Sequence, residues 1–168
     1  MPDDLPFVRW TIRAAIACYA GRVLADVSGV GSYRLRRLLW TLGLACYLLH
    51  FFAAFHVVHR WSHAAALVDT QQATEAITGW KSGAGLWVNY AFSLFWLGDL
   101  VAWWSVGPGY PRQHRRMFWA VHGLFAFIVF NATAVFGPAF WRPVVCAFAL
   151  LIGFACLARI RPGLRPER

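Results

Sequence analysis

Long apolar runs separated by short polar segments dominate the pattern of this chain. The runs occupy residues 38–58, 84–104, 117–137 and 143–160. About 20 helical residues cross a bilayer core of about 30 Å, so the first three runs are long enough to span it. The fourth is shorter, and its flanking residues Arg142 and Arg159 can extend to the membrane surface. The pattern predicts an all-α fold, a polytopic transmembrane helix bundle with four strong spans, in which residues 1–168 form a single integral-membrane domain.

A fifth segment, residues 8–29, combines an apolar face with charged side chains. Its apolar positions recur at intervals of three and four residues, as in Val8, Ile12, Ile16, Tyr19 and Val23. Its charged residues are Arg9, Arg13, Arg22 and Asp26. This pattern fits a helix on the membrane surface as well as a fifth span packed against the others. The charges that flank the segment favour the fifth span.

The composition strengthens the membrane interpretation. The chain is 60% hydrophobic and 14% charged, whereas an ordinary soluble domain is about 45–50% apolar and about 25% charged. The net charge of +9 comes from arginines at the edges of the apolar runs and in the tails. No basic helix face or nucleic-acid-binding module accompanies them, so we expect no nucleic-acid partner. The expected partner is the lipid bilayer.

The arginine-rich segments set the expected orientation. They contain Arg34, Arg36 and Arg37, then Arg112, Arg115 and Arg116, and finally Arg159, Arg161, Arg165 and Arg168. If the four runs span, all three segments lie on one side, which the positive-inside rule makes cytoplasmic. We therefore expect a multi-pass protein of the bacterial inner membrane with a cytoplasmic C-terminus. Residues 59–83 then form an extracytoplasmic connection, with a helix at about residues 62–78.

Tryptophans gather near the ends of the expected spans. One group, Trp61, Trp80, Trp87 and Trp141, falls at the outer boundary, and the other, Trp40, Trp103, Trp104 and Trp119, at the inner boundary. Tryptophan is enriched at both membrane surfaces. We interpret the two groups as aromatic belts that anchor the bundle.

Polar residues inside the spans fall at matching depths. Asp99 and His122 each lie about 7–8 Å inside the cytoplasmic boundary, on spans joined by a short loop. The sequence therefore predicts an intramembrane Asp99–His122 pair, which either fixes helix packing or serves a proton or ligand path. The same arithmetic predicts an interhelical polar contact between Asn89 and Asn131.

Histidines cluster where the first strong span reaches the outer boundary. His56, His59 and His63 share one face of an uninterrupted helix, whereas His50 points elsewhere. Three imidazoles on one face suit zinc or copper, and ordinary interfacial polarity is the alternative. A bis-histidine haem is disfavoured, because His50 and His122 differ in depth by roughly 10 Å.

No known catalytic motif accompanies these residues, and three kinds of function remain. The first is a metal-binding accessory or redox-related protein with His56, His59 and His63 as ligands. The second is a small oligomeric transporter or channel that uses Asp99 and His122. The third is a structural subunit or scaffold of a larger membrane complex.

Overall fold

The computed structural model describes the backbone of residues 5–160 and the side chains of residues 6–157. Within that range the chain is all-helical and has no strand, which confirms the all-α part of the predicted fold class. The elements are α1 (Leu5–Ser28), α2 (Tyr33–Val57), α3 (His63–Thr78), α4 (Ala84–Val106), α5 (Tyr110–Gln113), α6 (Arg115–Phe130), the π-helical η1 (Asn131–Val135) and α7 (Trp141–Ile160).

Local sequence explains where α2 and α3 begin and end. Ser32 and Ser62 cap the two helices, and each hydroxyl accepts a hydrogen bond of 3.2 Å from the backbone N–H three residues later. Between the helices, Arg60 and Trp61 adopt positive φ angles of 49° and 60°. These left-handed residues interrupt the helix, so α2 and α3 are separate elements with different directions.

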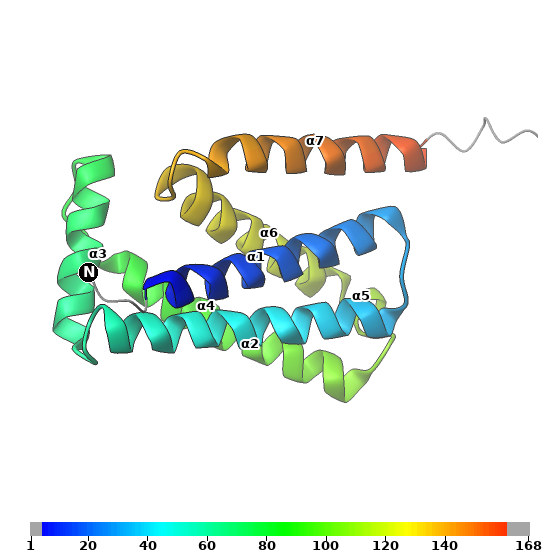
Figure 1. The fold of residues 1–168 in the computed structure, drawn as a ribbon. Helices are drawn as coiled ribbons and strands as arrows, with labels where there is room; N and C mark the ends of the chain where they lie inside the picture. Colours follow the sequence, from blue (N-terminus) through cyan, green and yellow to red (C-terminus); the bar gives the residue numbers. More distant parts are fainter. Residues whose placement is uncertain (1–4, 161–168) are drawn as a thin grey trace, which may run out of the picture.

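The long helices run lengthwise and α3 crosses one end of the bundle (Figure 1). The α1–α2 connection, α5 and the last turn of α7 lie at the opposite end. The first two arginine-rich segments, around Arg36 and Arg115, therefore share one end of the molecule, as the expected topology requires. The third segment, with Arg161, Arg165 and Arg168, lies outside the described residues.

Aromatic rings form the centre of the core, where α1, α2, α4 and α6 meet. The Phe125 ring lies 4.4 Å from Trp40, 4.5 Å from Phe92 and 4.6 Å from Trp96, measured between centroids. Gly43 lets α2 approach this cluster, since a Cβ atom there would lie 3.0 Å from the Trp96 ring. The core is thus built mainly from large rings around a small residue.

Two helices are long and apolar enough to cross a membrane: Tyr33–Val57 and Arg115–Val135, which joins α6 to η1. The prediction of four strong spans is therefore not confirmed, and two of the four predicted runs correspond to candidate spans by length and composition. The described apolar part of α7, Trp141–Leu157, is shorter, and α4 carries the polar residues Asn89 and Asp99 within its apolar sequence. These two spans, and the fifth at α1, stay predictions.

Two tryptophans expected at the inner membrane surface lie instead in the interior. Trp40 is 0% exposed and Trp103 is 2% exposed. The guanidinium of Arg22 lies over both rings, 4.1 Å from the Trp40 centroid and 4.5 Å from that of Trp103. The belt interpretation is wrong for these two residues, because a buried arginine holds them inside the bundle.

Candidate functional site

The three clustered histidines have separate partners. The Trp61 indole N–H donates to His56 Nδ1 at 3.0 Å, His59 Nδ1 lies 3.1 Å from a carboxylate oxygen of Asp69, and His63 Nδ1 lies 3.0 Å from the Tyr90 hydroxyl. The left-handed turn after α2 divides the expected helical face, so the imidazoles point to different neighbours. Among the residues that the structure describes, no group of three or more His, Cys, Asp or Glu side chains could hold a metal ion.

Asp99 bonds to two other side chains and not to His122. The Trp40 indole N–H and the Tyr110 hydroxyl each donate a hydrogen bond of 2.8 Å to its carboxylate. Trp40 also lies next to the imidazole, with its ring centroid 6.3 Å from that of His122. The helices of Asp99 and His122, α4 and α6, do contact each other through Phe92 and Phe125. The Trp40 indole of α2, however, bonds to Asp99 and lies beside His122.

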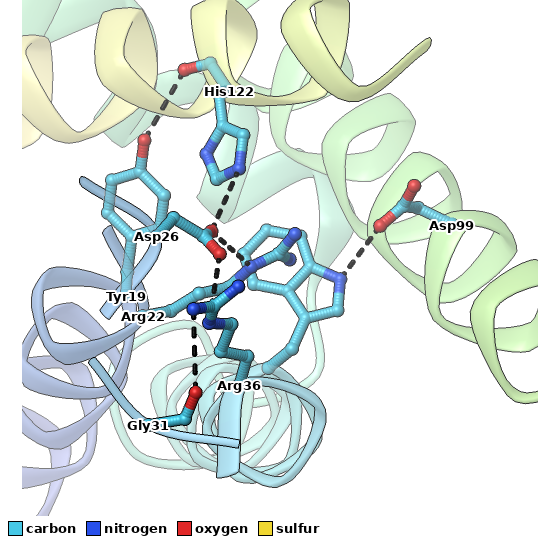
Figure 2. Close-up of polar contacts among 8 residues, drawn as sticks. Tyr19, Arg22, Asp26, Gly31, Arg36, Asp99 and His122 are labelled. Atoms are coloured by element: carbon cyan, nitrogen blue, oxygen red, sulfur yellow. Dashed lines mark hydrogen bonds and ion pairs between the residues drawn. The ribbon is translucent and has the colours of Figure 1, made fainter. Parts of the chain in front are cut away.

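His122 instead faces Asp26 of α1 (Figure 2). Its Nε2 lies 3.6 Å from Asp26 Oδ2, and its backbone carbonyl accepts a hydrogen bond of 3.3 Å from the Tyr19 hydroxyl. Asp26 also lies 3.4 Å from Arg22 Nε and 3.5 Å from Arg36 Nε. One carboxylate therefore joins α1, α2 and α6.

The Asp26 carboxylate stabilises the buried charge of Arg22. Arg22 is 2% exposed, and removing a charge from water costs several kcal/mol even after relaxation. The two indole rings over the guanidinium return about 2 kcal/mol or somewhat more each when desolvated. The contacts with the two rings only roughly offset the cost of burying the guanidinium, so a nearby negative charge is needed. Asp26 supplies that charge to Arg22 and Arg36, and Asp99 adds a second negative charge near Arg22.

Asn89 and Asn131 form hydrogen bonds with other residues. The backbone carbonyl of Asn89 accepts hydrogen bonds from Tyr47 and Ser93, and the Asn131 amide donates to the Phe127 carbonyl. No hydrogen bond joins Asn89 to Asn131 in the described part of the chain. Asn131 is the first residue of the π-helical η1, and its amide bonds back to the preceding turn of α6.

A cavity of about 1030 Å³ lies between α1, α6 and α7. Ligand pockets commonly have volumes of about 300–1,000 Å³, so this one is large enough for a bulky ligand. Its wall is mostly aliphatic and aromatic, and includes Val23, Ala126, Val145 and Phe148. Gly123 also lines it, and a Cβ atom at Gly123 would meet no heavy atom within 4 Å.

Most polar groups in this wall already have protein partners. Thr133 donates to the Val129 carbonyl at 2.6 Å, Tyr19 donates to His122, and the Arg13 guanidinium lies over the rings of Trp10 and Phe140. The cavity therefore presents an apolar surface to any occupant. Asp26 and His122 mark its end near the arginine-rich segments.

A second cavity of about 630 Å³ adjoins the first. Asp26, Phe118 and Trp119 line both cavities. The remaining wall of the smaller cavity carries three arginines, Arg36, Arg112 and Arg115. Together the cavities pair a long apolar space with a basic compartment.

Sequence reasoning did not identify Arg22, Asp26 or Tyr110 as partners in this region. Arg22 and Asp26 were visible as two opposite charges four residues apart inside an otherwise apolar helical face, a spacing that allows an ion pair. Tyr110 lies in the loop between two spans and had no signal of its own.

Searches with this chain match no protein-family model, no curated protein and no solved structure.

Proposed function

We propose that the protein is a lipid-binding protein of the bacterial inner membrane. The cavity between α1, α6 and α7 carries this proposal, because its large volume and apolar wall suit a hydrocarbon chain. A lipid reaches such a site from within the bilayer and buries its chains there. Because the chain arrives from the apolar bilayer, the binding energy comes from van der Waals packing against the cavity wall and not from area removed from water.

Exposed apolar side chains support the membrane setting. Leu94 on α4 is 71% exposed, and Leu150 and Phe154 on α7 are 75% and 71% exposed. Leu150 and Phe154 lie four residues apart and so on one face of α7, and soluble monomers rarely expose large apolar patches. In the proposal α1, α2, α4, α6 and α7 all span the membrane, and the arginine-rich end with the C-terminus is cytoplasmic.

The burial of charge on α1 supports a fifth span. Its 24 residues reach about 36 Å, and it packs alongside α2, where His50 Nδ1 lies 2.9 Å from the Val8 carbonyl. Arg22 is buried within the bundle and is paired there with Asp26. Intramembrane charges are tolerated in this arrangement.

The other functional hypotheses draw less support from the geometry. A metal site would require His56, His59 and His63 to converge, and their side chains have different partners. A path through Asp99 and His122 would require contact between them, and Trp40 lies beside both. A purely structural role would leave the cavity without an occupant, so a lipid-binding measurement separates it from the proposal.

Filling the cavity tests the proposal. Gly123→Leu places a side chain in the open space of the cavity wall, and Gly98→Leu makes the same change at a glycine of α4 that also has no neighbour within 4 Å. We expect full-length protein purified in mild detergent to retain bound lipid, measured by native mass spectrometry. Gly123→Leu should lower lipid occupancy about tenfold, equivalent to about 1.4 kcal/mol, whereas Gly98→Leu should match the wild type. Equal occupancy in all three proteins would contradict lipid binding in this cavity.

A further inference from the structure

The smaller cavity has an excess of positive charge. Arg36 from α2, Arg112 from α5 and Arg115 from α6 line it, and Asp26 is its one acidic residue among those described. Asp26 already lies against Arg22 and Arg36. Within the described chain, no acidic side chain pairs with Arg112 or Arg115. The compartment is therefore complementary to an anion.

The position of this charge relates it to the apolar cavity. Phe118 and Trp119, one helical turn after Arg115, line both compartments. An amphiphile with its chain between α1, α6 and α7 can thus place its polar end beside the arginines. A wholly apolar ligand would leave the basic compartment unused, and a small anion alone would leave the larger cavity unused.

We infer that the site binds a phospholipid whose headgroup carries a net negative charge, and that Arg36, Arg112 and Arg115 hold this headgroup at the cytoplasmic surface. The inference rests on the proposed lipid-binding function and specifies its ligand class. Arginine suits this role because its planar guanidinium can donate two parallel hydrogen bonds to phosphate oxygens. Basic pockets between membrane helices on the cytoplasmic side commonly recognise such headgroups.

Two double variants of equal charge test the inference. Arg112→Gln/Arg115→Gln removes two arginines from the compartment. Arg34→Gln/Arg116→Gln removes two exposed arginines from the same end of the molecule that do not line it. Binding of phosphatidylglycerol and phosphatidylcholine to the full-length protein is compared by native mass spectrometry in detergent.

We expect the wild type to prefer phosphatidylglycerol about tenfold. The Arg112/Arg115 variant should lose this preference while still binding phosphatidylcholine. The Arg34/Arg116 variant should keep the preference within about twofold, because these two arginines are also exposed but do not line the compartment. Inorganic phosphate at the lipid concentration should not compete, since it lacks the chain that binds in the apolar cavity.

Three results would overturn the inference. The first is a wild-type protein that shows no preference for phosphatidylglycerol over phosphatidylcholine. The second is an equal loss of that preference in both double variants, and the third is complete displacement of the lipid by inorganic phosphate. The Gly123→Leu variant separates these failures from failure of the proposed function. If Gly123→Leu lowers binding of both lipids while the arginine changes have no effect, lipid binding stands and the headgroup assignment falls.

Discussion

Asp26 lies against two guanidinium groups in the interior of the bundle, and its removal should be costly. Asp26→Ala leaves the buried Arg22 without its ion pair, so we expect the free energy of unfolding to fall by about 3–5 kcal/mol. Asp69→Ala is the matched control, because that carboxylate pairs with His59 but is 52% exposed, and its loss should cost less than about 1 kcal/mol. Denaturant unfolding in detergent micelles measures both. Similar losses for the two variants would show that Asp26 does not balance Arg22.

Tyr110 should titrate at unusually high pH. Burial raises the pKa of its hydroxyl to about 12, and the hydrogen bond to Asp99 and the charge of that carboxylate act in the same direction. In the unfolded chain the pKa is the ordinary 10.0. The contribution of Tyr110 to stability is therefore complete below pH 10 and declines as the pH rises from about 10 to about 12.

A difference titration isolates this residue. Phenolate absorbance of the wild type minus that of Tyr110→Phe should show one group titrating near pH 12. Tyr110→Phe should also reduce the free energy of unfolding by about 1.5–3 kcal/mol at neutral pH, because a hydrogen bond to a charged group is lost. Titration near pH 10 would mean that Tyr110 is neither buried nor bonded to Asp99 in the folded protein.

At the scale of helices, Gly43 allows α2 to approach α1 and α4 closely. A Cβ atom there would lie 3.0 Å from the Trp96 ring and 3.3 Å from Cys18 Cβ. Gly43→Leu should therefore overpack the core and destabilise the fold by about 1–3 kcal/mol or more. Thermal unfolding compared with Gly98→Leu, a substitution on an open surface of α4, checks this expectation. Equal melting temperatures for Gly43→Leu and Gly98→Leu would mean that α2 lies farther from α4 than the structure shows.

The helices were largely predictable from apolar periodicity, whereas their rotation was not. The predicted run at residues 38–58 corresponds to α2, which begins earlier, at Tyr33, because Ser32 caps it and the intervening arginines are good helix formers. Counting residues predicted similar depths for Asp99 and His122. It gave no information on azimuth, the direction in which each side chain points around its helix axis. The Asp99–Trp40 bond depends on azimuth, and so the sequence could not predict it.

The histidine cluster illustrates a second limit of the sequence. The predicted shared face assumed an uninterrupted helix, and the positive φ angles of Arg60 and Trp61 end that helix between His56 and His63. Neither residue type signals a left-handed turn, in contrast to Gly79, which ends α3 with φ 75°. The side-chain partners of the histidines follow from this turn.

For the whole molecule, the proposal places α3 and its flanking loops outside the cytoplasm. Lys81 is exposed in this region and is the chain's single lysine. A membrane-impermeant amine reagent should therefore modify Lys81 in spheroplasts, detected by peptide mapping, and Lys81→Arg should abolish that modified peptide. Modification only after the membrane is disrupted would reverse the proposed orientation.

Photocrosslinking tests the central claim most directly. A phosphatidylglycerol with a diazirine in its acyl chain is incorporated with the full-length protein and irradiated, and the modified residues are mapped by mass spectrometry. Lipid binding in the cavity predicts crosslinks concentrated on its walls, at residues such as Val23, Ala126 and Phe148, and their loss in Gly123→Leu. Crosslinks spread evenly over the exposed apolar faces of α2, α4 and α7, unchanged by Gly123→Leu, would contradict the account.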